Sequence, residues 1–104
     1  MSNPQNPKIE QYAEIFKALS NPNRLKIFLR LISTTYPIKR GISNIGDNTC
    51  VGELGKDLGI VKSTVSHHIK ELKRVGLIRT IRQGQKVECV IDPDVLKDLK
   101  DFFL

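Results

Sequence analysis

The side chains of this sequence that are most capable of chemistry are two histidines and two cysteines. His67 and His68 are the only histidines, and they stand side by side in STVSHHIKEL, residues 63–72. A pair of histidines raises the possibility of a metal site. On a helix, however, two ligands of one ion lie three or four positions apart, because those positions share a face. Adjacent positions diverge by about 100°, so we predict that these two histidines do not bind one metal ion together.

The stretch around the histidines has the pattern of an amphipathic helix, and this helix separates them. Its apolar residues recur at spacings of four, three and three, as Val65, Ile69, Leu72 and Val75. This periodicity predicts one buried side. At about 100° per residue, His67 points away from that side and His68 lies at its edge. We predict an external contact for His67, with a plain surface histidine as the alternative, and packing against the core for His68.

The net charge of +6 is concentrated in one quarter of the chain. Residues 62–86 contain seven basic side chains and one acid, Glu71, whereas the other residues carry ten basic and ten acidic side chains. A scattered charge is usually only a solvated face. An excess that is confined to one segment favours a polyanionic partner instead.

The outward face of this helix, together with the basic segment after it, is suited to DNA. Hydroxyl and imidazole groups can bond phosphates or base edges, and Lys and Arg neutralise the charge of the backbone. The segment that follows has the composition of a wing, which lies along the minor groove or the phosphates. The predicted DNA contacts are Lys62, Ser63, Thr64, Ser66, His67, Lys70, Arg74, Arg79, Arg82, Gln83, Gln85 and Lys86.

Three further helices are predicted before this one. Residues 9–19 repeat apolar side chains at spacings of three and four. In the second helix, Asn21 is the expected cap and Pro22 takes the first position. A short third helix over 51–58 ends at Gly59. The buried stripe expected for the second helix is Leu25, Phe28, Leu29 and Ile32.

Two segments fall outside the helical pattern. Residues 1–8 are rich in Pro and Asn and cannot bury enough surface to become ordered, so we predict a disordered arm. Residues 34–49 contain two glycines, a proline and small polar side chains, which predicts a long surface loop. With that loop included, residues 9–104 have the length of one domain with a single modest core.

A β-hairpin and a last helix complete the predicted fold. Two β-rich runs, residues 77–82 and 86–92, surround Gln-Gly-Gln, and Gly84 lets the tip turn closely. Asp92 and Pro93 then begin the final helix. Two short helices followed at once by a basic hairpin form a winged helix-turn-helix. We therefore predict a mainly α fold with a small hairpin, in the order α-α-α-α-β-β-α.

Two stretches of the sequence resemble the ArsR-type (ArsR/SmtB) winged-helix regulators of bacteria and archaea. They are ALSNPNRLKIFLRLI and VGELGKDLGIVKSTVSHHIKELKRVGLI, and within them STVSHHIKELKRVGLI is the specific part. Apart from the long loop, the likeness covers roughly residues 12–92. The resemblance implies operator binding by Ser63, Thr64, Ser66 and His67, with repression that an inducer relieves.

The resemblance also implies a homodimer built from the first and last helices. Independently, both helices carry apolar faces that a core of this size does not cover completely, and these faces can meet across a two-fold axis. The residues expected in the dimer interface are Tyr12, Ile15, Phe16, Leu19, Leu96, Leu99, Phe102 and Phe103.

The usual metal sites of the family are incomplete in this chain. The arsenic- and lead-type sites use a Cys-x-Cys pair at the start of the third helix, where this sequence has Cys50 and Gly52. The zinc-type site needs histidines on the last helix, and DPDVLKDLKDFFL contains none. We therefore assign no cofactor and no metal ligands, although binding of a metal ion stays open.

The two cysteines suggest another way to sense a signal. The alternation of Cys89 with Glu88 and Val90 directs it to the core, where its simplest role is that of a small buried hydrophobe. In winged helices the segment before the third helix often pairs with the second wing strand, which would bring Cys50 near Cys89. Our hypothesis is that they form a redox-sensitive pair or two ligands of a larger site.

The predicted function is that of a homodimeric repressor that binds a double-stranded DNA operator and is released by a metal, redox or other small signal. The alternative is a winged helix that docks on protein, but such a module does not need all its net charge on one helix and hairpin. No nucleophile–base set, phosphate loop or paired acids indicates an enzyme. No apolar run approaches the roughly 20 residues of a membrane span, and no secretory signal is present, which favours the cytoplasm.

Overall fold

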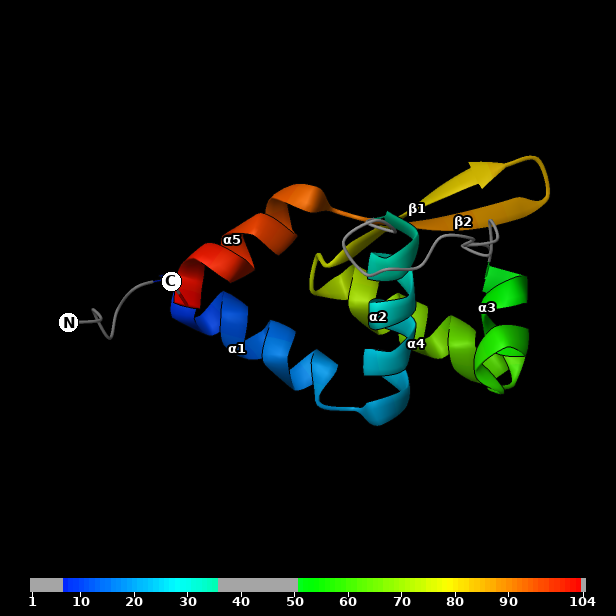
Figure 1. The fold of residues 1–104 in the computed structure, drawn as a ribbon, viewed down its shortest axis with the longest axis horizontal. Coiled ribbons are helices and arrows are strands. Elements are labelled where there is room, and N and C mark those ends of the chain that lie inside the picture. The colour runs from blue at the N-terminus through cyan, green and yellow to red at the C-terminus, as the bar shows by residue number, and fades with distance from the viewer. Residues whose placement is uncertain (1–6, 36–50, 104) are drawn as a thin grey trace.

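The computed structural model describes residues 7–35 and 51–103. Their elements are α1 (Pro7–Leu19), α2 (Pro22–Thr35), α3 (Val51–Leu58), α4 (Lys62–Arg74), β1 (Ile78–Gln83), β2 (Lys86–Ile91) and α5 (Pro93–Phe103) (Figure 1). This order confirms the predicted winged helix-turn-helix. No helix in the described part of the chain is both long enough and apolar enough to span a membrane.

Two helix boundaries differ from the sequence-based prediction, and the strands differ from it by one residue at three of their ends. α1 begins at Pro7 rather than at residue 9, because proline suits the first turn of a helix, where its missing N–H is not needed. α2 continues through Thr35 into the segment predicted as a loop, and Ser33, which is buried, donates to the Leu29 carbonyl oxygen in this last turn. The rest of the predicted arm and loop lies outside the described residues.

The start of α2 is as predicted, and its buried side is predicted correctly at Phe28, which is buried, and at Ile32, which is partly buried against the core. The Asn21 side-chain oxygen accepts the Arg24 backbone N–H at 3.1 Å, which confirms the cap. The predicted stripe is wrong at Leu25 and Leu29, which are 38% and 39% exposed. The fully buried residues of α2 are Ile27 and Leu31. Because α2 is apolar on more than one side, two sets of residues have helical spacing, and only the neighbouring elements decide which is covered.

The core unites the helices with the base of the hairpin. Burying a large aliphatic side chain contributes about 1.5–3 kcal/mol, so these contacts hold α4 and the wing against the helical body. Cys89 is fully buried, as predicted. The most deeply buried residues are Ile15, Ile27, Leu31, Leu54, Val65, Leu72, Leu77, Ile78 and Cys89.

A short, tight turn joins α3 to α4. Gly59 has a φ of 68°, a left-handed conformation that favours glycine and confirms the predicted end of α3. The Ile60 N–H donates to the Gly55 carbonyl oxygen at 2.9 Å. A Cβ on Gly55 would collide with the Ile60 carbonyl oxygen and approach Val65 Cγ2 to 3.2 Å. The turn therefore requires a residue without a side chain at Gly55.

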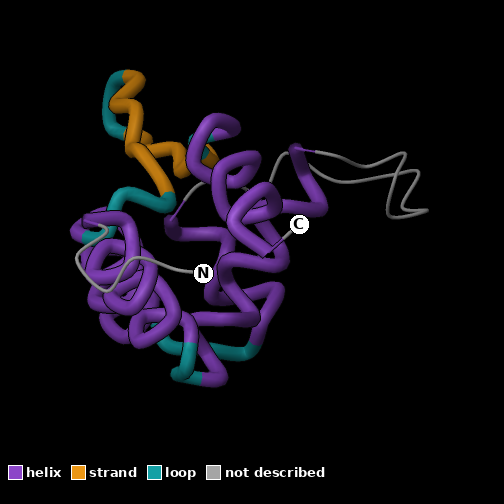
Figure 2. The backbone as a smooth tube through the Cα atoms, turned by 90° about the vertical axis from the view of Figure 1, so that its left-hand side faces the viewer, coloured by secondary structure: helices purple, strands orange, loops and turns teal. Residues whose placement is uncertain are grey.

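The hairpin forms the predicted wing. β1 and β2 are antiparallel, with Ile78 opposite Ile91 at the base and Gln83 opposite Lys86 at the tip. Gly84, with a φ of 63°, makes the turn between the strands. Figure 2 shows the strands extending away from the helices. The base of the hairpin therefore packs in the core, while its tip is free to reach a partner.

α5 returns to pack against α1 through aromatic side chains. The Tyr12 and Phe102 ring centroids are 4.4 Å apart, and those of Phe16 and Phe103 are 5.5 Å apart. The residues predicted for a dimer interface are therefore divided by the fold of the single chain. Tyr12, Ile15 and Leu99 are buried in its core, Leu19 and Leu96 are half-buried, and Phe16, Phe102 and Phe103 are exposed.

Candidate nucleic-acid interface

α4 presents a polar face on the side opposite its buried residues. Val65, Ile69 and Leu72 are buried, as the periodicity predicts. No side chain caps the start of the helix, so the N–H groups of its first turn can donate to an anion such as a phosphate. The exposed members of the predicted contact set on α4 are Lys62, Ser63, Ser66, His67, Lys70 and Arg74, and Thr64 is half-buried.

The wing adds a second exposed polar surface. Its tip contains no acidic side chain, and the only acid on either strand, Glu88, is half-buried near the middle of β2. A cationic strand pair of this kind can run along the sugar-phosphate backbone. The predicted wing contacts are all exposed: Arg79, Arg82, Gln83, Gln85 and Lys86.

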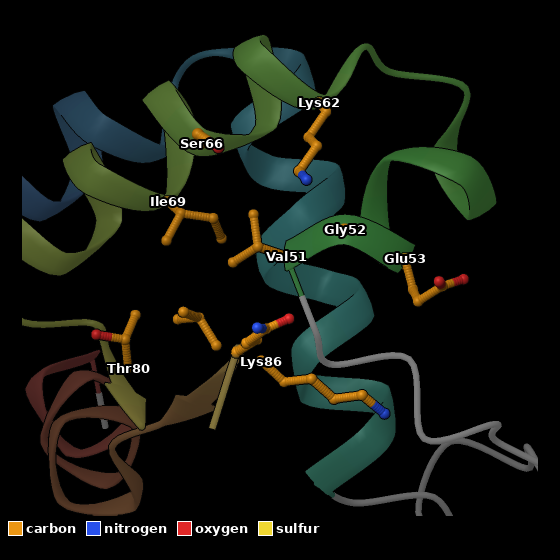
Figure 3. A pocket seen from close by; sticks show the side chains of 10 residues that line it. Val51, Gly52, Glu53, Lys62, Ser66, Ile69, Thr80 and Lys86 are labelled. Carbon is orange, nitrogen blue, oxygen red and sulfur yellow. The ribbon is translucent and has the colours of Figure 1, made fainter. Parts of the chain in front are cut away.

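A hollow of about 480 Å³ lies between α4, the wing and the start of α3 (Figure 3). Val51, Ile69 and Val87 contribute apolar lining. In Figure 3 the Lys62 side chain extends into the hollow, whereas the Glu53 carboxylate points away. Its polar lining residues are Glu53, Lys62, Ser66, Thr80, Gln85 and Lys86. The hollow thus brings predicted contacts of the helix and of the wing to one surface.

Thr80 also belongs to this surface, although it is not among the predicted contacts. Thr80 lies on β1 opposite Cys89, is half-buried and lines the hollow. Residues two apart on a strand share a face, so Thr80 is on the same side of β1 as Arg82. That alternation was present in the sequence and could have identified it.

Arg74 differs from the other predicted contacts because it is already engaged within the chain. Its guanidinium lies 3.5 Å from the Glu14 carboxylate of α1 and 3.4 Å from that of Glu71. The side chains of both ion pairs are partly exposed, so each pair contributes little to stability. The pair with Glu14 nevertheless places the Arg74 guanidinium next to α1. We therefore leave Arg74 out of the interface proposed below.

The two histidines occupy different environments, as their positions on the helix predict. His67 is exposed, whereas His68 is only 6% exposed and accepts a hydrogen bond at Nδ1 from Arg24 Nε at 3.3 Å. Burial lowers the pKa of His68 below its ordinary value, and the charges of Arg24 and His67 lower it further. His68 is therefore a packed, neutral residue, and His67 alone faces outward.

The thiol hypothesis concerns a residue that the structure does not describe. Cys89 is buried on β2, but Cys50 lies outside the described residues, so their pairing stays a prediction. Within residues 7–35 and 51–103, no three His, Cys, Asp or Glu side chains are grouped so that they could hold a metal ion.

Together, these elements define a winged helix-turn-helix DNA-binding domain: α3 and α4 form the helix-turn-helix, and the basic hairpin forms the wing. The family model of the helix-turn-helix domain matches residues 19–81. Among relatives, the chain is 41% identical over 92 residues to YceK of Bacillus subtilis (strain 168), an uncharacterized HTH-type transcriptional regulator. The match covers 88% of this chain and 81% of YceK. It is also 30% identical over 90 residues to the transcriptional repressor SdpR of the same organism, over 86% of each chain.

A solved structure supports the same classification. The homodimeric winged helix-turn-helix DNA-binding domain Mb0332 from Mycobacterium bovis, a possible ArsR-family transcriptional regulator, matches with a TM-score of 0.66 and 25% identity. The match covers 96% of this chain and 84% of that one. The chain therefore belongs to the ArsR-type winged helix-turn-helix regulators and is a DNA-binding transcriptional regulator. This family and fold are those of DNA-binding regulators rather than of enzymes.

Proposed function

We propose that the chain is a homodimeric repressor that binds an operator with α4 in the major groove and the wing along the adjoining backbone, until a small signal releases it. The observation that carries the proposal is the hollow shared by α4 and the wing, around which exposed cationic and hydroxyl side chains gather. In duplex DNA a strand of the backbone separates the major groove from the minor groove. A helix and a wing on one protein surface can therefore contact the major groove and the adjoining backbone at the same time.

The residues of this surface have separable roles in the proposal. Ser63, Ser66 and His67 lie on the exposed face of α4 and read base edges. Lys62 and Lys70, together with the wing residues Arg79, Arg82, Gln83, Gln85 and Lys86, bind phosphates or the minor groove. Thr80 joins this set because it lines the same hollow as Lys62 and Lys86.

Two observations favour a dimeric repressor. The relative SdpR is a transcriptional repressor, and the Mb0332 domain is homodimeric. In this chain Phe16, Phe102 and Phe103 remain exposed on the packed pair α1 and α5. A two-fold axis through these residues would cover them and would present two copies of α4 to successive major grooves.

The direct test is operator selection with the full chain. Fragments of genomic DNA are bound, recovered and sequenced, and the enriched site is then measured by fluorescence anisotropy. We expect an inverted repeat whose half-sites are spaced by about one helical turn, or a multiple of it. Recovery of no preferred sequence would contradict operator binding. Addition of metals and oxidants to the purified complex then tests for release.

Removing charge from the wing should weaken binding to every DNA sequence. We expect Arg82→Gln/Lys86→Gln to lose affinity for operator and unrelated duplexes alike. With four charges removed per dimer, the slope of log affinity against log salt concentration should become shallower by about 3 to 4 units. Anisotropy titrations over a range of salt concentrations measure both effects. Lys97→Gln/Lys100→Gln is the matched control, since both lysines are exposed on α5, and it should change the slope little.

Replacing the outward histidine should change sequence preference instead. We expect His67→Ala to lose about 1 kcal/mol or more of discrimination at one base pair of each half-site, with little effect on unrelated DNA. Competition between the operator and its single-base variants measures this. Equal operator binding by the triple variant His67→Ala/Arg82→Gln/Lys86→Gln would refute the DNA interface and favour a protein-docking surface.

A further inference from the structure

Arg24 is placed where three helices meet. Its side-chain Nη1 donates to the Ala18 carbonyl oxygen, near the end of α1, at 3.1 Å. Its Nε donates to His68 Nδ1, in the middle of α4, at 3.3 Å. Its own backbone N–H is held by Asn21 at the start of α2. One guanidinium therefore links the turn between α1 and α2 to the helix that carries the proposed base contacts.

This link requires His68 to be neutral. The arginine side chain carries only donors and stays charged, so Nδ1 of His68 must offer a lone pair and the ring proton must be on Nε2. Protonation at Nδ1 would place a second donor and a second positive charge against the guanidinium, inside a site where His68 is 6% exposed. The hydrogen bond and the protonated ring therefore exclude each other.

The surroundings of His68 favour the neutral ring. The charged or titratable groups that act on it are Arg24 from α2 and His67 from its own helix, and both disfavour a positive charge. On the side of α1, the Arg24 guanidinium itself donates a hydrogen bond to the Ala18 carbonyl oxygen. Burial and these two groups together lower the pKa of His68, in agreement with the geometry.

We infer that Arg24 and His68 are positioning residues for DNA recognition, which hold α4 at the orientation that presents His67 and its neighbours to the operator. His67 is adjacent in the chain, and the two imidazole centroids are 5.7 Å apart, so a movement of His68 displaces the outward ring directly. The inference rests on the operator contacts proposed above, and it assigns to Arg24 and His68 a role that depends on the hydrogen bond between them.

Protonation of His68 should break its hydrogen bond with Arg24 and so weaken operator binding. Position 67 carries a second imidazole, so the effect of His68 is measured in the His67→Gln background, where that ring is absent. His68→Asn then removes the ring whose protonation is being tested.

The decisive experiment measures operator affinity in the His67→Gln background, with asparagine or leucine at position 68. Asparagine keeps an acceptor at about the reach of Nδ1 and does not titrate, whereas leucine fills the site without an acceptor. At pH 7.5 we expect the asparagine variant to bind like its parent, and the leucine variant to bind roughly tenfold more weakly, because a buried donor loses its partner. Between pH 7.5 and 5.5 the parent His67→Gln should lose affinity as the pH falls, and the asparagine variant should not.

Equal affinities of the asparagine and leucine variants, or a loss in acid that persists in the asparagine variant, would overturn the inference. Arg24→Lys provides a second check, since it keeps the charge but lacks the fixed guanidinium geometry, and it should match the leucine variant. Thermal melts of each variant establish that the compared proteins are folded at both pH values.

Two measurements without DNA separate this inference from the proposed function. Nitrogen NMR shifts of the imidazole at pH 7.5 should show His68 with its proton on Nε2. The free energy of unfolding should not respond to His68 above about pH 6.5, and it should fall as the pH decreases from there towards the lowered pKa, because the unfolded chain binds the proton first. His68→Asn should lack this part of the decrease. A proton on Nδ1 at pH 7.5 overturns the inference alone, whereas a folded wild type that binds no operator overturns the proposed function and the inferred role together.

Discussion

Replacing Phe16 and Phe103 together with serine is expected to turn the proposed dimer into monomers and to weaken operator binding by roughly a hundredfold or more, because two linked sites bind far more tightly than separate ones. Phe16 is 38% and Phe103 66% exposed, and their rings are in contact across α1 and α5. Their exposed surface is large for aromatic side chains, and a second copy of the chain can cover it. Tyr12 and Ile15 are left unchanged, because they belong to the core of the single chain.

The oligomeric state is measured by size-exclusion chromatography with light scattering, and the affinity by anisotropy on the selected operator. The control is Leu29→Ser, because Leu29 is apolar and 39% exposed but lies on α2. It should remain dimeric and bind normally. A Phe16→Ser/Phe103→Ser protein that stays dimeric with full affinity would place the interface elsewhere.

Replacing Gly55 with alanine is expected to have the largest effect on folding. A Cβ at this position has no room between the Ile60 carbonyl oxygen and Val65, so the turn between α3 and α4 must open. Overpacking of this kind lowers the free energy of unfolding by about 1–3 kcal/mol. For a domain of this size, that corresponds to a fall in Tm of roughly 5–15 °C.

The control for this prediction is another glycine of the same helix. A Cβ on Gly52 meets nothing within 4 Å, so Gly52→Ala should leave Tm unchanged or raise it, since alanine is the better helix former by about 1 kcal/mol at most. Thermal unfolding followed by circular dichroism compares the two. A Gly55→Ala protein as stable as Gly52→Ala would show that the turn adapts without strain.

The helix α4 was predictable because its apolar pattern has one interpretation. Val65, Ile69 and Leu72 are the only apolar set with helical spacing on α4, and the residues opposite them are polar. Because only one face of α4 can be the buried face, the same pattern predicts that the His67 side chain points outward and that the His68 side chain points towards the core. The end of α3 and the turn of the wing were also predictable, because each is marked by a glycine in the sequence. Gly59 and Gly84 both adopt left-handed conformations that other residues rarely adopt.

The contacts between elements were not predictable in the same way. Leu25 and Leu29 have the same spacing as residues that are buried, and the packing of α2 against its neighbours left these two outside. The ion pair between Arg74 and Glu14 joins side chains sixty positions apart in the sequence, so the periodicity of α4 did not predict it. The hydrogen bond from Arg24 to His68 joins residues forty-four positions apart. The spacing of apolar residues along a helix does not predict contacts over that separation.

The sequence by itself determined the order of the elements, the polar face of α4, the basic wing and the membership of a regulator family, because these depend on local spacing, turn residues and the placement of charge along the chain. Only the tertiary structure decided which cations are exposed, which aromatic side chains the single chain leaves exposed, and which side chain forms a hydrogen bond with His68. The physical reason is that burial and hydrogen bonding are settled between segments distant in sequence. A neutral imidazole against Arg24 exists only once α1, α2 and α4 have come together.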